Sequence, residues 1–201
     1  IATRGFAFPR DDGNGPMDAV RRKRAIEGMA MRKRLLCVGM VICLGLWACG
    51  GGGGGNGDGD CTTPSSGTSM TAAEDALGAE VLNLVNAERT GRSLDPVSWH
   101  GGLAQVGFEH SWDMNTRGFF AHENPCGEGP DTRVSRAGIG WTAVAENIAR
   151  GQATAMAVMV AWMDSSGHRA NILNGQMTHI GIGVYQVGGD TYWTMVLIRA
   201  P

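Results

Sequence analysis

Two histidines and one glutamate have the residue types and local sequence of a binding site. His122 follows two phenylalanines and an alanine in a stretch that contains asparagine and proline, which predicts a loop. His168 follows Ser-Ser-Gly, where the glycine is expected to break a helix, and Glu146 lies between the histidines in the sequence AENIA. Loops that are anchored beside apolar residues commonly hold binding groups. A neutral imidazole can bind a metal ion, and a buried carboxylate needs a partner that a histidine or a metal ion can supply.

The sequence contains no short-spaced metal signature. Neither His-Glu-x-x-His nor Cys-x-x-Cys is present, so a metal site has to be assembled from distant segments. Spacing alone therefore does not separate a site from scattered polar residues. Of the other histidines, we expect His100 at the surface beside a helix start and His110 as a hydrogen-bonded residue of the core. His179 is expected to be either structural or pocket-lining.

The elements that must position these side chains indicate an α+β domain. Thr71 and Glu74 have the pattern of a capping box, and Gly91 is expected to end the helix that follows. Apolar periodicity and turn residues predict further helices over about 102–117, 131–137 and from 154, and strands over 179–186 and 191–198 joined at two glycines. Because helices come first and a hairpin last, with little alternation between them, α+β is favoured over a doubly wound sheet.

The charges divide the 201 residues into two unlike parts. Residues 1–48 carry nine Lys and Arg against four Asp and Glu, whereas residues 49–201 carry eight Arg, no Lys and 15 acidic residues. The net charge of −2 therefore describes neither part. An acidic, lysine-free body has no basic patch to replace phosphate counterions, which argues against nucleic acid as a partner.

The basic part is predicted to be a targeting segment. Residues 35–48 form an apolar run behind three basic residues, too short for a spanning helix and typical of a signal peptide. The run ends in LWAC, which resembles the lipobox of bacterial lipoproteins and makes Cys49 the expected lipidation site; the alternative is a secretory signal that is cleaved near Ala48. We thus expect upstream or mis-started sequence over 1–30, a lipoprotein signal over 31–48 and a glycine-rich tether over 49–70.

Cysteine usage predicts one disulfide in the mature chain. After removal of the signal only Cys49, Cys61 and Cys126 remain. With Cys49 lipidated, the other two form an even pair in an oxidising compartment, so a Cys61–Cys126 disulfide is expected over free thiols. A nucleophilic Cys126, four residues from His122, is the alternative, and it would need electropositive, partly exposed surroundings.

Several segments in order resemble one protein family. They read VLNLVNAERTGRSLDPVSW, HSWDMNTRGFFAHENP, RVSRAGIGW, AENIARG, AWMDSSGHRANILN and THIGIGVY. Together they resemble the bacterial branch of the CAP superfamily, the SCP-like extracellular domains related to cysteine-rich secretory proteins, wasp antigen 5 and plant pathogenesis-related protein 1. The resemblance implies a single CAP domain over 71–201, folded as a three-layer α-β-α sandwich with an open cleft.

The resemblance also implies which residues line that cleft. In CAP domains two histidines and two acidic residues do so, and His122, Glu146 and His168 match three of them. The second acid falls on Ser165, with Asp164 adjacent, so the fourth position is in doubt. Two imidazoles can hold one divalent cation, such as Zn²⁺ or Mg²⁺, and leave positions open for water or a ligand.

Family membership fixes the fold better than the function. The first hypothesis is an extracytoplasmic, lipid-anchored binding module of the cell envelope, whose cleft takes a cation and a small lipidic, peptide or cell-wall ligand. The second is a hydrolase, metal-assisted or not, that uses His122, Glu146 and His168. The third is a surface interaction protein with a vestigial cleft. Binding is favoured over turnover, because no shared catalytic activity defines the family.

Overall fold

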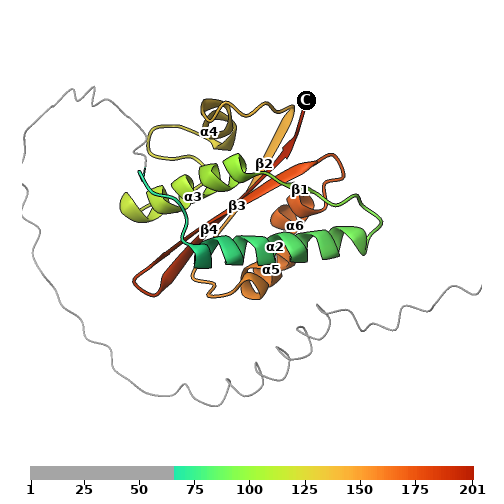
Figure 1. The fold of residues 1–201 in the computed structure, drawn as a ribbon, viewed down its shortest axis with the longest axis horizontal. Helices are drawn as coiled ribbons and strands as arrows, with labels where there is room; N and C mark the ends of the chain where they lie inside the picture. The colour runs from blue at the N-terminus through green and yellow to red at the C-terminus, as the bar shows by residue number, and fades with distance from the viewer. Residues whose placement is uncertain (1–65) are drawn as a thin grey trace, which may run out of the picture. The chain divides into compact units, whose positions relative to one another are not determined.

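The computed structural model describes residues 66–201, and the statements below refer to that part of the chain. Its helices and strands alternate irregularly along the sequence (Figure 1). The helices are α2 (Ala72–Thr90), α3 (Gly101–Thr116), α4 (Pro130–Arg136), α5 (Ala155–Asp164) and α6 (Ser166–Ile172). The strands are β1 (Ser98–Trp99), β2 (Ala143–Arg150), β3 (His179–Val187) and β4 (Asp190–Arg199).

The strands form one mixed sheet in the order β1-β3-β4-β2. The short strand β1 runs parallel to β3, and the other neighbours are antiparallel. In the register of β2 and β4, Glu146 pairs with Val196 and Asn147 with Met195. Strand β2 lies at the edge of the sheet. Because successive side chains of a strand point to opposite faces, the side chains of Glu146 and Asn147 lie on opposite faces of the sheet.

Helices cover both faces of the sheet, which confirms the expected three-layer α-β-α sandwich and the α+β class. Helices α3 and α4 pack on the face to which Glu146 points, and α2, α5 and α6 pack on the other. The approach of α3 to the sheet is very close: a Cβ on Gly183 would lie 1.8 Å from the backbone nitrogen of Phe108. On the opposite face, a Cβ on Gly78 of α2 would lie 3.0 Å from the carbonyl oxygen of Ile182. Glycine is therefore needed where α3 crosses β3.

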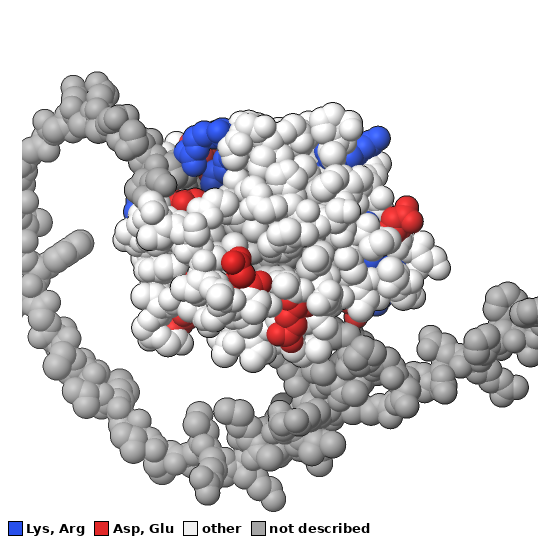
Figure 2. All heavy atoms as spheres, viewed as in Figure 1, with Lys and Arg blue, Asp and Glu red and all other residues white. Residues whose placement is uncertain are grey.

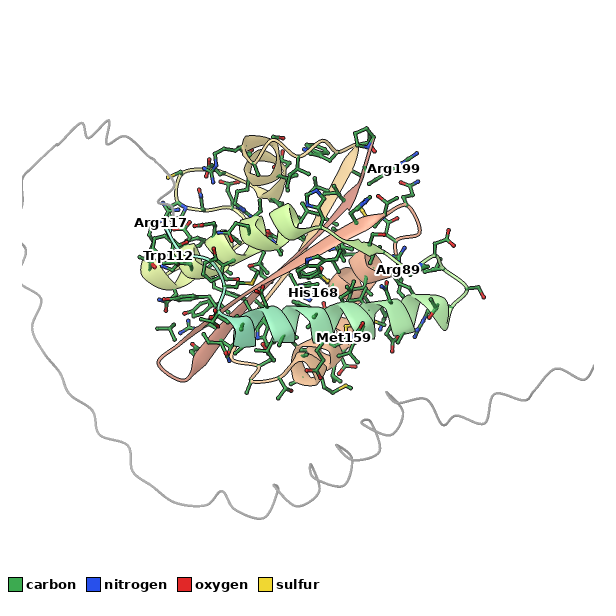
Figure 3. All side chains as sticks on the ribbon, in the orientation of Figure 1. Arg89, Trp112, Arg117, Met159, His168 and Arg199 are labelled. Carbon is green, nitrogen blue, oxygen red and sulfur yellow. The ribbon has the colours of Figure 1, made fainter. Side chains whose placement is uncertain are left out.

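Helix α2 is held at both ends by buried charged side chains. At its start, Thr71 and Glu74 form the predicted capping box, and Glu74 also accepts a hydrogen bond from the backbone nitrogen of Gln186 at 2.7 Å. Near its end (Figure 3), Arg89 is completely buried and donates to backbone carbonyls at the end of α6 and in the loop that follows it, among them those of Ile172 and Met177. The guanidinium thus replaces the water that those carbonyls would otherwise bind.

The hairpin and the longer helices agree with the sequence predictions within a few residues, and the structure adds detail at three places. The segment around AENIA, for which no strand was predicted, is strand β2. The residues around His168, expected to be a break and a short turn, form the helix α6. His100, expected at the surface, is half-buried and caps α3, because its Nδ1 accepts a hydrogen bond from the backbone nitrogen of Leu103 at 3.2 Å.

Charged side chains are scattered singly among uncharged ones on the face shown in Figure 2. Among the described residues, the exposed large apolar side chains are Trp99 at 38% and Phe120 at 50%. Within this part of the chain no helix combines the length and the hydropathy needed to cross a bilayer. The predicted signal peptide, the predicted lipidation site Cys49, the tether up to residue 65 and Cys61 lie outside the described residues.

Candidate functional site

His122 and Glu146 are in direct contact. His122 lies in the loop between α3 and α4, and its Nδ1 is 2.8 Å from Oε1 of Glu146 on β2. An ionised carboxylate can only accept hydrogen bonds, so Nδ1 of His122 carries the proton. The lone pair of the neutral ring is then on Nε2, and 51% of the side chain is exposed. His122 is therefore a half-exposed imidazole whose tautomer leaves Nε2 able to bind a metal ion or a proton.

The carboxylate of Glu146 is buried and held by two partners. Its Oε2 accepts a hydrogen bond from Nη2 of Arg133 at 2.7 Å, and its Oε1 accepts the bond from His122. Burial alone would raise the pKa of Glu146. The hydrogen bond from His122 and the charge of Arg133 outweigh burial and hold the pKa below its usual range. Glu146 is thus a fixed anion at neutral pH, already neutralised by a buried arginine.

A buried histidine, His110, lies next to the contact between His122 and Glu146. His110 on α3 is buried, as predicted, and its Nε2 donates a hydrogen bond to the carbonyl oxygen of Ala121 at 3.0 Å. The same nitrogen is 3.9 Å from Oε1 of Glu146. Burial, assisted by the charge of Arg133, lowers the pKa of His110 to about 4 although Glu146 opposes the shift. His110 is therefore neutral at physiological pH and contributes packing and one fixed hydrogen bond.

His168 is brought to the site from the other side of β2. Its backbone carbonyl accepts a hydrogen bond from the side chain of Asn147 at 3.0 Å, and Asn171 of α6 donates to both Asn147 Oδ1 and the carbonyl of Glu146. These amide contacts attach α6 to β2. Burial first, and then the nearby His122, lower the pKa of His168. The two histidines are thus close enough to influence each other electrostatically.

The adjacent residues Glu146 and Asn147 therefore hold the two sides of the site. Glu146 contacts the loop that carries His122 on one face of the sheet, and Asn147 contacts the helix that carries His168 on the other. The strand geometry of β2 makes this possible, since neighbouring side chains point in opposite directions. Glu146 and Asn147, two neighbouring residues of β2, thereby attach both the loop of His122 and the helix of His168 to the same strand.

The loop that carries His122 is braced from within. The side chain of the buried Asn124 accepts hydrogen bonds from the backbone nitrogens of Cys126 and Glu128 at 2.9 Å and 3.1 Å. Arg117, at the C-terminal end of α3 (Figure 3), donates to Cys126 Sγ at 3.2 Å. Cys126 is disulfide-bonded, which removes the alternative of a thiolate nucleophile in this state. Its expected partner Cys61 lies outside the described residues, so that pairing stays a prediction.

The fourth position of the site falls where α5 meets α6. Ser165 connects the two helices and makes no side-chain cap hydrogen bond, and Asp164 is exposed at the end of α5. Within residues 66–201 no cluster of three or more His, Cys, Asp or Glu side chains is arranged to hold a metal ion. A cation site at His122 and His168 therefore stays a prediction from the family resemblance.

Sequence reasoning missed Arg133 and the role of His110 in this site. Arginine is usually exposed, and Arg133 lies among charged and polar residues of a short helix, so its burial had no local signal. His110 was placed correctly in the core, but its proximity to Glu146 depends on how α3 crosses the sheet. The buried carboxylate was the available clue, because burial of a charge requires a partner of opposite charge.

Comparisons with known proteins agree with this architecture. A model of the cysteine-rich secretory protein family (CAP) matches residues 82–197, a span that includes His122, Glu146 and His168. YkwD of Bacillus subtilis is 38% identical over 137 residues, which cover 68% of this chain and 51% of YkwD. The membrane protein YlbC of the same organism is 31% identical over 105 residues, which cover 52% of this chain and 30% of YlbC. The chain thus spans about half of the first relative and under a third of the second.

Solved structures share the fold. An extracellular protein containing an SCP domain from Bacillus anthracis superposes with a TM-score of 0.60 at 30% identity, over 66% of this chain and 45% of that one. An outer surface protein from Borrelia burgdorferi also gives a TM-score of 0.60, at 16% identity, over 66% of this chain and 97% of that one. At that lower identity the likeness shows the fold alone.

Proposed function

The chain belongs to the cysteine-rich secretory protein (CAP) family, and from this premise we propose that it is an extracytoplasmic binding module. In this proposal His122 and His168 hold a divalent cation, Zn²⁺ or Mg²⁺, and the open positions take a small lipidic, peptide or cell-wall ligand. The extracellular SCP-domain protein of Bacillus anthracis, 30% identical to this chain, supports a location outside the cytoplasm.

The tautomer of His122 carries the proposal. Because Glu146 accepts the Nδ1 proton at 2.8 Å, the half-exposed ring presents the lone pair of Nε2, as in the carboxylate–histidine–metal arrangements of known sites. The lowered pKa of His168, due to burial and to His122, keeps the second ring neutral to a lower pH. Neutral imidazoles favour Zn²⁺ over Mg²⁺, which prefers oxygen ligands. A bound Zn²⁺ would supply a Lewis acid for a carbonyl, carboxylate or phosphate oxygen of the ligand.

Zinc binding tests the proposal directly. The purified chain, freed of metal by a chelator, is titrated with Zn²⁺ by calorimetry, and the metal content is checked by mass spectrometry. We expect one site in the wild type and loss of that site in the double variant His122→Ala/His168→Ala. The matched control is His100→Ala/His179→Ala, since these rings also lie near each other, with centroids 6.1 Å apart.

The outcomes separate the three functional hypotheses. If the wild type binds no divalent ion at micromolar concentration, the metal-binding proposal is refuted. Binding that is lost equally in both double variants places the ion elsewhere. If zinc is lost only in the His122/His168 variant and no turnover is found, the binding module stands; if cell-surface behaviour is also unchanged, the site is vestigial in the cell.

A hydrolase is the second candidate, and one contact favours it. The bond between His122 Nδ1 and Glu146 orients an imidazole in the manner that a general base requires. In such a reaction His122 Nε2 would accept the proton of a water molecule, and Glu146 would stabilise the resulting imidazolium. Incubation of the metal-free chain with peptide and ester libraries tests this, because a zinc ion on Nε2 would occupy the same lone pair. Product formation that vanishes in His122→Ala would establish it.

The predicted lipid anchor and disulfide complete the proposal. We expect Cys49 to carry the lipid, so the Cys49→Ala variant should move from the membrane fraction to the soluble fraction of the cell. Retention of that variant in the membrane would contradict the anchor. For the Cys61–Cys126 disulfide, thiol titration of the unreduced mature chain should find no free thiol, and two free thiols would refute the pairing.

A further inference from the structure

Arg133 on α4 connects three segments that meet at the site. It is 3% exposed, and its guanidinium donates to Glu146 Oε2 at 2.7 Å, to the backbone carbonyl of His122 at 2.9 Å and to that of Glu128 at 2.7 Å. Two of these acceptors are the carbonyls at the ends of the segment 122–128, which carries the His122 ring, and the third is the carboxylate that accepts the hydrogen bond from the ring. One side chain thus contacts both the backbone and the hydrogen-bond partner of His122.

We propose that Arg133 is the positioning residue of the site: it fixes the tautomer and the place of the His122 ring by holding the loop and the Glu146 carboxylate together. As far as metal affinity is concerned, this proposal rests on the proposed function. The tautomer of the ring in the metal-free chain can be measured whether or not the chain binds a metal.

Hydrogen bonds within the loop allow the contacts of Arg133 to position it as a unit. Asn124 binds the backbone nitrogens of Cys126 and Glu128, and its side-chain nitrogen donates to the Glu128 carboxylate at 2.9 Å. The segment from 124 to 128 is therefore braced as a unit, and the bonds from Arg133 to the carbonyls of His122 and Glu128 set its position relative to β2. Arg117 contacts the same loop at Cys126, on the side of α3 rather than of β2.

The planar fork of arginine suits this geometry, and lysine does not replace it. A guanidinium presents several N–H groups in fixed directions and stays protonated, whereas an ammonium is a compact point charge. The acceptors of Arg133 come from a carboxylate and two carbonyls. A lysine can keep the positive charge beside Glu146, but it cannot reach all three acceptors with the same alignment. The two roles of Arg133, charge and geometry, are therefore separable by substitution.

The experiment compares Arg133→Gln and Arg133→Lys with the control Arg136→Gln. Arg136 lies on the same helix, but it is exposed and its bond is to the Glu128 side chain. Long-range proton–nitrogen NMR of the metal-free chain, at a mildly alkaline pH where imidazole is neutral, reports the tautomer of His122. Calorimetric titration with Zn²⁺ reports affinity. A residue that serves only overall stability would change neither quantity in a folded variant.

We expect the His122 ring to be protonated on Nδ1 in the wild type and in Arg136→Gln, and to shift towards Nε2 protonation in Arg133→Gln. Zinc affinity should fall about tenfold to hundredfold in Arg133→Gln, as for other residues that orient metal ligands, and less in Arg133→Lys. An unchanged tautomer and an unchanged affinity in folded Arg133→Gln would overturn the proposal.

Two further outcomes keep the proposal testable. If Arg133→Gln does not fold, Arg133→Lys decides, because an affinity and a ring tautomer equal to those of the wild type would refute the geometric role. If the wild type binds no zinc, the proposed function fails, whereas the tautomer comparison still supports or overturns the role of Arg133.

Discussion

Two pairs of histidines lie in the described part of the molecule, and their surroundings give them different chemistry. The site pair is His122 and His168, on either side of β2. The edge pair is His100 and His179, beside β1, with ring centroids 6.1 Å apart in an edge-to-face arrangement. In the site pair, Nδ1 of His122 donates to a carboxylate; in the edge pair, Nδ1 of His100 accepts from the backbone nitrogen of Leu103. The partner of Nδ1 therefore differs between His122 and His100.

That difference decides which nitrogen is left to bind a ligand. A neutral His100 that accepts at Nδ1 must carry its proton on Nε2, so its remaining nitrogen is a donor and not a metal ligand. His179 Nδ1 is 2.9 Å from the hydroxyl of Thr178, which can donate or accept. His100 therefore caps a helix, whereas His122 presents a lone pair. An imidazole whose other nitrogen donates to an acceptor, as Nδ1 of His122 does, is oriented to bind a metal ion.

The largest expected effect comes from the glycine contact that supports both pairs. Strand β3 begins at His179, and α3 starts at the His100 cap and carries His110. In Gly183→Ala the new Cβ would lie 1.8 Å from the nitrogen of Phe108, so α3 has to move away from the sheet. We expect a loss of at least about 4 kcal/mol of unfolding free energy, or no folding, measured by urea denaturation. The control is Gly101→Ala, where a Cβ meets nothing within 4 Å; equal stability of the two variants would contradict the close packing.

Removal of the Glu146 carboxylate is expected to affect His122 and not the edge pair. In Glu146→Ala the buried Arg133 loses its carboxylate, and breaking a buried ion pair in this way costs about 3–5 kcal/mol. The control is Asp190→Ala, which removes an exposed ion pair with Arg150 and should change stability little. NMR signals of His122 should shift, while those of His100 and His179 stay in place. A shift of both pairs would mean that they are not independent.

Acid is expected to lower the unfolding free energy through His110, the buried histidine next to Glu146. The pKa of His110 is lowered from 6.5 to about 4, mainly by burial, so between these values the unfolded chain binds a proton that the folded chain does not. The unfolding free energy therefore falls as the pH drops from 6.5 to 4, by about 3 kcal/mol for this group, and is constant below. Glu146, whose pKa is lowered from 4.5, adds a further loss of stability as the pH falls below that value. Urea unfolding across this range should show a shallower slope in His110→Gln, and the same slope in both proteins would contradict the assignment.

The smallest effect tests the structural role of the edge pair. His100→Ala removes the side-chain cap of α3, which is expected to cost about 1 kcal/mol, whereas His100→Asn can restore the bond to Leu103. Thermal or urea unfolding of the three proteins measures this. If Ala and Asn are equally stable, the ring of His100 does not act as a cap, and the contrast with His122 weakens.

The sequence predicts the elements better than it predicts the site network. Local signals, such as the Thr71–Glu74 box, Thr154 and the Gly188–Gly189 hairpin, depend on neighbours in the chain, and the structure confirms them. Strand β2 lacks such a signal, because AENIA mixes small and polar residues whose partners lie on other elements. Its pairing with β4 and its contacts with α5 and α6 are set by the fold as a whole.

Resemblance to the CAP family identified His122, Glu146 and His168, and the structure joins His122 and Glu146 by a hydrogen bond. It did not identify Arg133, whose partner lies 13 positions away on another element. Nor did it give the tautomer of His122, which depends on one oxygen of one carboxylate. Contacts of this kind follow from how the layers pack, and a single sequence carries little record of them.

The outer side of β2 has a consequence for the solubility of the chain. On that side the carbonyl of Ile148 accepts a hydrogen bond from the indole of Trp162 at 3.2 Å, and the carbonyl of Glu146 accepts one from Asn171 at 3.1 Å. A strand at the margin of a sheet is otherwise a template on which a second chain can add a strand and begin a fibril. Side chains from α5 and α6 occupy those two acceptors, so the strand that organises the site is also guarded against edge-to-edge aggregation.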